Sequence, residues 1–164
     1  MSTDATRLSD LMVRAVEAGT RHVLSGGLPF VGVVVTADGW VSAPGFNRVP
    51  ETGDPTAHAE IVAIRQAAEE RGASALTGAT LLATGEPCAL CYRFSAGHGI
   101  SRVYYAVDRD SAAEWGFDYR AGYAADRTQD LALSATAQHL AVDGALEPFV
   151  AYLHRQAGGS APRL

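Results

Sequence analysis

The sequence contains no lysine, and its 13 basic residues, all arginine, are not gathered into a run. Acidic residues outnumber them, which gives a formal net charge of -5 at pH 7. Proteins that bind nucleic acid normally present clustered lysine and arginine to the phosphates. The sequence has no such cluster of basic residues, and we therefore expect no nucleic acid among the partners.

Long apolar runs are also absent, since no stretch approaches the roughly 18 residues that a membrane helix requires. The first 21 residues mix charged and apolar side chains and contain no signal-peptide core. We therefore expect no membrane association and a cytoplasmic location.

Cysteine is scarce too. The two cysteines lie three positions apart, which excludes a disulfide scaffold and favours a metal or redox role in a reducing compartment.

The chain has 164 residues, of which 48% are hydrophobic and 19% charged. This is enough to bury a core, and no internal repeat or linker divides it. We expect one domain over residues 1–156, followed by a disordered tail over 157–164, where glycine, serine and proline accumulate.

Hydrophobic periodicity and turn residues predict alternating strands and helices. Helices are expected at 5–24, 56–71, a short stretch from Pro87, 109–115 and 146–155. Strands are expected at 31–35, 79–84, 102–107 and 137–142, with a return strand at 40–43 after the Asp38-Gly39 turn. Residues 44–55 read as a loop, and 116–129 favour no element. The order predicts an α/β fold with helices on both faces of a mixed sheet. In such folds, sites lie where strands end and helices begin.

One candidate site is the stretch Pro87-Cys88-Ala89-Leu90-Cys91. An offset of three residues places both thiols on one helix face. A helix N-terminus, where Pro87 is well tolerated, favours the thiolate form that binds metal. The pair is therefore a natural half-site for zinc. The spacing alone fits a thioredoxin-like redox pair, or two small core residues, equally well.

The second candidate is His58-Ala59-Glu60, in the first turn of an expected helix. Either residue could serve the helix end alone, His58 as a cap or core group and Glu60 through the helix dipole. Together with Cys88 and Cys91, however, His58 gives three zinc ligands and leaves a fourth position for water, the pattern of a catalytic zinc site. Glu60 would then be the unligated general acid and base.

The two motifs together form the known signature of zinc deaminases. On these residues the sequence resembles the cytidine deaminase-like superfamily, and within it looks most like the bacterial guanine deaminases. The similar stretch comprises Pro29-Phe30, Asn47, Asp54 to Glu60, Glu86 to Cys91, and Ala113 to Asp118.

The resemblance implies a three-layer α/β/α sandwich around a mixed sheet of about five strands, a bound Zn²⁺ and a homodimer. It implies that Glu60 moves the proton to the base and to the departing ammonia, that Asn47 binds the base and that Phe30 lines the pocket. Further substrate contacts are expected from Ala57, Trp115 and Asp118.

This sequence departs from the family at two positions near the pocket. Val31 adds bulk where relatives carry glycine, and Tyr119 stands where relatives tend to carry a second acidic residue, a role that Asp118 could take over. Both changes widen the expected substrates beyond guanine. A segment near the C-terminus closes an active site in relatives. For Phe149 and Tyr152 we favour packing within a helix over such a role.

The sequence thus predicts a zinc-dependent hydrolase that deaminates a free base. The expected substrates are guanine or a related amino-purine, amino-pyrimidine or triazine, including damaged or analogue bases. One alternative keeps the chemistry and moves it to RNA, as a tRNA adenosine deaminase; the net charge of -5 and the missing lysine argue against it. An alternative of another class is a structural zinc or redox module without activity, in which Glu60 would be idle.

Overall fold

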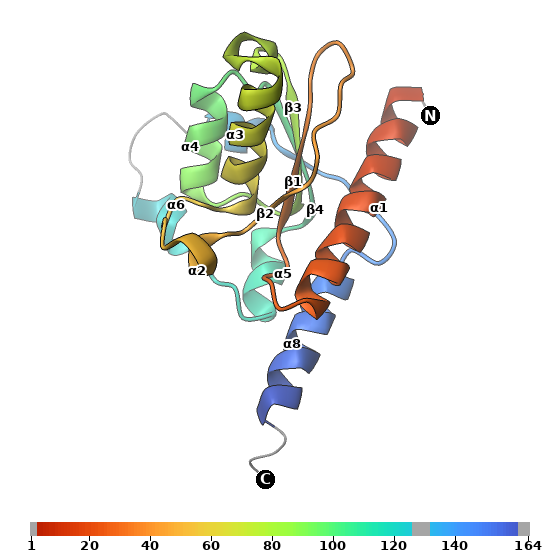
Figure 1. The fold of residues 1–164 in the computed structure, drawn as a ribbon, viewed down its shortest axis with the longest axis vertical. Helices are drawn as coiled ribbons and strands as arrows, with labels where there is room; N and C mark the ends of the chain where they lie inside the picture. Colours follow the sequence, from red (N-terminus) through yellow and green to blue (C-terminus); the bar gives the residue numbers. More distant parts are fainter. Residues whose placement is uncertain (1–2, 126–131, 161–164) are drawn as a thin grey trace.

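The computed structural model describes residues 3–125 and 132–160 and has an α/β architecture (Figure 1). The helices are α1 (Thr3–Leu24), α2 (Val49–Thr52), α3 (Ala59–Arg71), a 3-10 helix η1 (Ala73–Leu76), α4 (Ala89–Gly97), α5 (Arg109–Glu114), α6 (Ala121–Ala125), α7 (Ala132–Thr136) and α8 (Glu147–Ser160). The strands are β1 (Val31–Val35), β2 (Gly45–Phe46), β3 (Thr80–Gly85), β4 (Arg102–Val107) and β5 (Gln138–His139).

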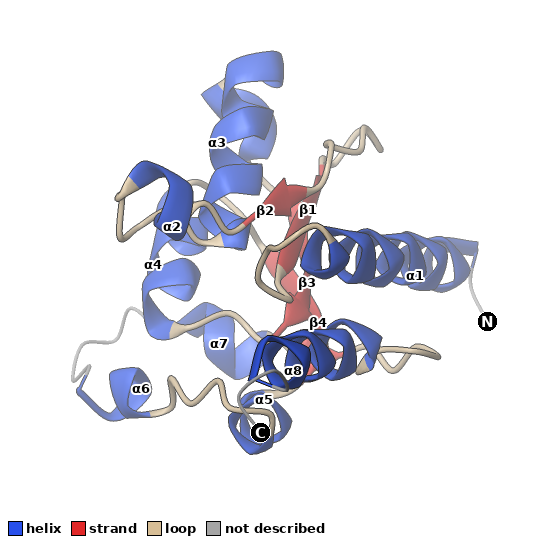
Figure 2. Ribbon diagram, turned by 60° about the horizontal axis from the view of Figure 1, so that its bottom comes forward, coloured by secondary structure: helices blue, strands red, loops and turns tan. Residues whose placement is uncertain are grey.

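The five strands form one mixed sheet in the order β2-β1-β3-β4-β5. Strand β1 runs antiparallel to β2 and to β3, whereas β3, β4 and β5 are parallel. Helices α1 and α8 cover one face, and α3, α4 and α7 cover the other (Figure 2). The predicted sandwich with a mixed sheet of about five strands is therefore confirmed. None of the helices in the described ranges is long and apolar enough to cross a membrane.

Side chains that alternate along β1 supply two cores. Val31, Val33 and Val35 belong to the cluster under α1, while Val34 belongs to the cluster under α3 and α4. Gly32 also faces α3, where a Cβ atom would lie 2.8 Å from the Cα of Glu60. The expectation that Val31 adds bulk near the pocket is therefore wrong, because its side chain packs on the opposite face of the sheet.

The predicted return strand at 40–43 is wrong. Only an isolated bridge joins Val35 to Val41, and pairing with β1 resumes at Gly45–Phe46. The hydroxyl of Ser42 accepts a hydrogen bond from the Val34 amide, which replaces a strand contact. Gly45 can pair here because it lacks a side chain: a Cβ atom would lie 2.5 Å from the backbone nitrogen of Ala63 in α3.

Two helices begin later than predicted. The side chain of Asp54 accepts hydrogen bonds from the amide and the hydroxyl of Thr56, at 2.9 and 2.6 Å. Such a turn competes with helical hydrogen bonding, so α3 begins at Ala59 with His58 at its N-cap. Similarly, α4 begins at Ala89 with Cys88 at its N-cap, and Pro87 precedes the helix instead of opening it.

The C-terminal part also differs from expectation. The strand expected at 137–142 is reduced to Gln138–His139, and α6 occupies 121–125 where no element was favoured. Helix α8 continues to Ser160. Residues 157–160 of the expected disordered tail are therefore helical, while 161–164 and 126–129 lie outside the described residues.

Candidate active site

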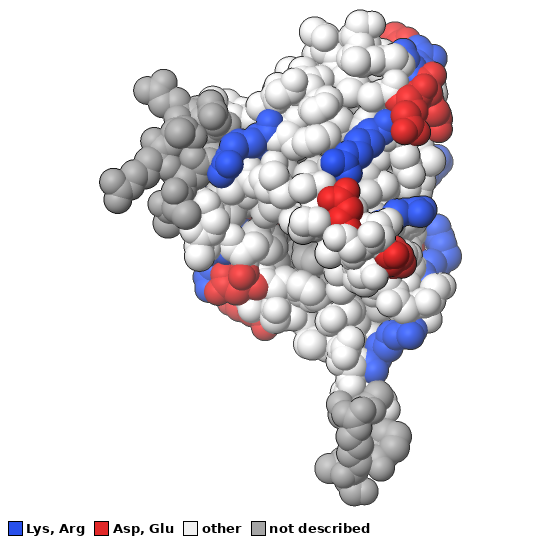
Figure 3. All heavy atoms as spheres, turned by 60° about the vertical axis from the view of Figure 1, so that its left-hand side comes forward, with Lys and Arg blue, Asp and Glu red and all other residues white. Residues whose placement is uncertain are grey.

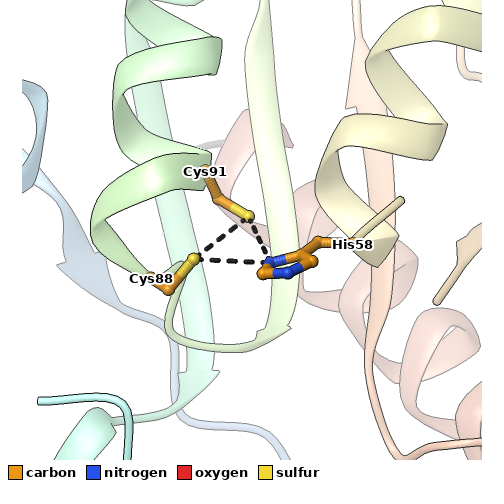
Figure 4. A group of neighbouring side chains, drawn as sticks. All are labelled: His58, Cys88 and Cys91. Atoms are coloured by element: carbon orange, nitrogen blue, oxygen red, sulfur yellow. Dashed lines mark hydrogen bonds between the residues drawn. The ribbon is translucent and has the colours of Figure 1, made fainter. Parts of the chain in front are cut away.

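The two sequence motifs meet where the N-termini of α3 and α4 converge. His58 is the N-cap residue of α3, Cys88 is the N-cap residue of α4, and Cys91 lies in the first turn of α4. The three side chains point toward one another (Figure 4). The Nδ1 atom of His58 lies 3.4 Å from each sulfur atom, and the two sulfur atoms are 3.5 Å apart.

This triangle fits a zinc ion. A tetrahedral zinc ion lies about 2.0–2.3 Å from its nitrogen and sulfur ligands, so its ligand atoms are separated by roughly 3.5–3.8 Å. The observed separations need a change of only a few tenths of an ångström. Two thiols and one imidazole also favour zinc, because calcium and magnesium prefer oxygen ligands. Among the described residues these three form the one group of ligand atoms close enough to share a metal ion.

The protonation states of the cysteines differ when no metal is bound. Hydrogen bonding with Cys91, reinforced by that with His58, lowers the pKa of Cys88 to about 4. The same contact and burial raise the pKa of Cys91 well above its usual value. The bond to Cys88 in turn raises the pKa of His58. The cluster therefore holds one thiolate and one thiol, and metal binding must displace the thiol proton.

Glu60 lies beside this cluster and is only 5% exposed. Its Oε2 atom is 3.4 Å from the sulfur of Cys91. Burial, with the negative charge of Cys88 as the second cause, raises the pKa of Glu60 to about 7. A buried carboxyl group beside the metal-ligand triangle is placed to accept a proton and to donate it again, as general acid-base chemistry requires.

A cavity of about 370 Å³ opens onto these four residues. Three of the expected substrate contacts line it, namely Phe30, Asn47 and Asp118. Asn47 accepts a hydrogen bond from the Val49 amide through Oδ1, at 3.0 Å, which leaves its amide nitrogen for the cavity. Asp118 is half-exposed and forms a 2.8 Å ion pair with Arg120. Hydrogen bonds from Arg120 lower the pKa of Asp118 to about 2.

The structure does not bring the other two expected contacts to the cavity. The backbone of Ala57 accepts a hydrogen bond from the Arg48 amide, and its side chain is buried outside the lining. Trp115 is not among the lining residues and packs behind the wall, in the apolar cluster around Ala112 and Phe149 that Phe117 also joins. Phe149 is fully buried there, which agrees with a packing role.

Sequence reasoning missed part of the wall. Leu28 and Phe117 line the cavity beside Tyr119, the position already singled out near the pocket. The Phe30 ring meets those of Phe117 and Phe149 edge-on at 5.1 and 5.6 Å between centroids. The one local feature of the sequence that could have indicated a cavity position for Phe117 is the preceding residue, Gly116. This glycine ends α5 with φ 95°, a conformation that side chains rarely adopt, and turns the chain into the cavity.

Comparisons with known proteins agree with this geometry. The family model of the cytidine and deoxycytidylate deaminase zinc-binding region matches residues 5–107. The chain is 42% identical to guanine deaminase of Bacillus subtilis over 106 residues, which covers 64% of this chain and 67% of the relative. It is also 41% identical to the tRNA-specific adenosine deaminase of Agrobacterium fabrum over 96 residues, or 58% of this chain and 60% of the relative.

Solved structures show the same fold. The X-ray structure of guanine deaminase from Bacillus subtilis superposes with a TM-score of 0.65 at 31% identity, over 94% of this chain and 95% of the other. Guanine deaminase from Nitrosomonas europaea gives a TM-score of 0.70 at 23% identity, over 86% and 81% of the two chains, a likeness of fold. On its matched residues, its fold and its cluster of His58, Cys88 and Cys91, the chain belongs to the cytidine and deoxycytidylate deaminase family of zinc enzymes.

Proposed function

We propose that the protein hydrolyses the exocyclic amino group of a free nucleobase and releases ammonia. The expected substrate is guanine or a related amino-purine, amino-pyrimidine or triazine, including damaged or analogue bases. One observation carries the proposal above all: the buried carboxylate of Glu60 faces both the metal-ligand triangle and a cavity of small-molecule size.

Each residue of the site has a role in this reaction. His58, Cys88 and Cys91 would hold zinc, which when bound supplies Lewis-acid activation of water. Glu60 would carry one proton of the attacking water to the ring nitrogen, and would then carry the proton of the resulting hydroxyl group to the departing amino group, so that amine plus water becomes oxo base plus ammonia. The amide nitrogen of Asn47 donates to the base, while Phe30 and Phe117 pack against it and exclude water.

The surface supports a small substrate over RNA. The cavity volume of about 370 Å³ is near the lower end for small-ligand pockets, which begin at about 300 Å³. On the face shown in Figure 3, the described arginine side chains stand apart among neutral residues and beside acidic ones. Because phosphate binding needs clustered positive charge, this face does not favour a tRNA substrate. The likeness to a tRNA-specific adenosine deaminase keeps that reaction as the alternative.

Ammonia release from a panel of substrates tests the proposal. Zinc-loaded protein and the Glu60→Ala variant would be compared on free guanine, adenine, cytosine, 2-aminopurine and an aminotriazine, on the matching nucleosides, and on an anticodon stem-loop RNA. We expect release from at least one free base by the unaltered protein and none by the variant. Release from the RNA alone would support the tRNA reaction instead.

Treatment with a chelator distinguishes an enzyme from a structural zinc module without activity. Removal of zinc from an enzyme should abolish ammonia release while the circular dichroism spectrum persists, whereas a structural module should unfold as it loses metal.

We further propose that the protein acts as a homodimer in the cytoplasm. Light scattering on the purified protein tests the first point, and cell fractionation tests the second.

A further inference from the structure

The carbonyl groups just before Cys88 are bound by two tyrosines from a distant part of the chain. The hydroxyl of Tyr119 donates to the carbonyl oxygen of Glu86 at 2.6 Å. The hydroxyl of Tyr123 donates to the carbonyl oxygen of Pro87, the next residue along. Glu86 and Pro87 lie between the end of β3 and the start of α4. A buried carbonyl group there needs a partner, since an unpaired one costs free energy.

The Glu86 side chain and Arg109 reinforce the same connection. The buried carboxylate of Glu86 accepts a hydrogen bond from the Arg109 amide at 2.8 Å and lies 3.5 Å from the Arg109 Nε atom. The guanidinium of Arg109 lies over the Tyr123 ring, 3.9 Å from its centroid. Glu86, Arg109, Tyr123 and Pro87 therefore form a closed ring of contacts.

Tyr119 belongs to the substrate-facing wall as well as to this network. It lines the cavity together with Phe117, and its ring meets that of Phe30 at 6.4 Å between centroids. Its hydroxyl group already donates a hydrogen bond to the Glu86 carbonyl oxygen. The side chain therefore contributes its aromatic ring to the cavity wall. The wall from Gly116 to Tyr119 is thus joined to the loop that leads into Cys88.

We propose that Tyr119 is a positioning residue that fixes the substrate-facing wall relative to the metal-ligand loop, with Tyr123 as the second point of attachment. The hydroxyl of Tyr119 acts through the Glu86 carbonyl and takes no part in proton transfer. Its effect on substrate binding rests on the proposed deaminase function, whereas its effect on the wall does not. Loss of the hydroxyl should loosen the wall and leave the zinc ligands in place.

The test compares Tyr119→Phe and Tyr123→Phe with Tyr104→Phe in zinc-loaded protein. Each change removes one oxygen atom and keeps the ring. Tyr104 lies on β4 against the α1 cluster, and its hydroxyl makes no hydrogen bond with the described residues, so it is the matched control. Three quantities would be measured: amide hydrogen exchange of residues 116–123, zinc content, and KM and kcat for the best base of the panel.

For Tyr119→Phe we expect exchange of 116–123 to accelerate by about three- to tenfold, the equilibrium effect of one lost hydrogen bond. KM should rise by a similar factor, with kcat within about twofold and zinc content unchanged. Tyr123→Phe should accelerate exchange in the same segment. The proposal is overturned if Tyr119→Phe behaves as Tyr104→Phe does in both exchange and KM. It is also overturned if zinc is lost or only kcat falls, because the hydroxyl would then act on the metal loop or on the chemistry.

The two proposals can fail separately. If the unaltered protein deaminates no base, the proposed function fails, and hydrogen exchange alone decides whether Tyr119 holds the wall. If bases are deaminated but exchange and KM do not respond to Tyr119→Phe, the function stands and the positioning role is wrong.

Discussion

The Oε2 atom of Glu60 lies 3.4 Å from the sulfur of Cys91, although 31 positions separate the two residues in the sequence. The contact exists because Gly32 lets the first turn of α3 approach β1 closely, while α4 begins directly after β3. The carboxylate therefore lies buried at the edge of the metal-ligand triangle, where the first turns of α3 and α4 meet.

Replacing Glu60 by glutamine should separate proton transfer from metal binding. Glutamine keeps the size of the side chain and removes the titratable group. We expect ammonia release to fall by about 10²- to 10⁴-fold, the usual contribution of a positioned acid-base group, while zinc content stays equal to that of the unaltered protein. Activity within tenfold of normal would mean that Glu60 is not the proton carrier.

The same variant should change how the stability of the metal-free protein depends on pH. The pKa of Glu60 is about 7 in the folded chain against an ordinary value of 4.5, so the folded state binds the proton more tightly. The free energy of unfolding therefore falls as pH rises from about 4.5 to 7. Glu60→Gln lacks this loss and should be the more stable of the two at pH 8, with the difference shrinking toward pH 4.5. Urea unfolding at both pH values measures it, and an equal difference at the two would contradict it.

Zinc affinity should weaken as pH falls. Without metal, Cys91 keeps its proton because its pKa is raised well above the usual value, and zinc binding must displace that proton. At least one proton is then released per zinc ion, so the dissociation constant should rise by about tenfold for each pH unit lost between pH 8 and 6. Competition with a chelator of known affinity measures this. A dissociation constant that does not change with pH would mean that both thiols are already ionised.

Arg65 should support the His58 ligand from outside the site. Its guanidinium binds the carboxylate of Asp54 at 3.1 Å and the hydroxyl of Thr56 at 3.0 Å, in the turn that precedes His58. Arg71 lies further along α3, pairs with Asp38 at 2.7 Å and lies 5.5 Å from the centre of the Trp40 ring, so it is the matched control.

Because both ion pairs are exposed, Arg65→Met and Arg71→Met should each change the free energy of unfolding by less than about 1 kcal/mol. Only Arg65→Met should raise the dissociation constant of zinc, by about two- to fivefold for a weakened exposed pair. Chelator competition on the two variants decides the point. Equal zinc affinities would show that the turn needs no support from Arg65.

The metal-ligand triad could be predicted because its signals are local. Cys88 and Cys91 are spaced for one helix face, and His58 and Glu60 fall at a helix start. The helix starts themselves were misplaced by two or three residues, in the case of α3 because the turn made by Asp54 competes with the helix.

The substrate-facing wall could not be predicted from local pattern. Phe117 reaches the cavity through a turn at Gly116, and Tyr119 is fixed by a carbonyl group 33 positions away. Trp115, two positions before Phe117, packs against the same apolar cluster and yet does not line the cavity. Contacts of this range depend on how helices and sheet pack, which periodicity does not encode.

Gly45 should be needed for the packing that places Glu60. A Cβ atom at this position would lie 2.5 Å from the backbone nitrogen and 2.8 Å from the Cα of Ala63, and 2.6 Å from the Ala59 carbonyl oxygen. These backbone atoms of α3 cannot yield as a flexible side chain would. Gly45→Ala should therefore displace the start of α3 and lower the free energy of unfolding by about 2 kcal/mol or more. Because His58 and Glu60 lie at that end of the helix, zinc affinity should fall as well.

Gly97→Ala is the control, since nothing lies within 4 Å of its Cβ position and alanine suits the last residue of α4. It should leave stability unchanged or raise it by up to about 1 kcal/mol. Urea unfolding of both variants, with chelator competition for zinc, gives the comparison. If Gly45→Ala is as stable as Gly97→Ala, the close approach of β2 to α3 does not hold the site. If Gly45→Ala is destabilised but binds zinc normally, that approach stabilises the fold without setting the position of His58.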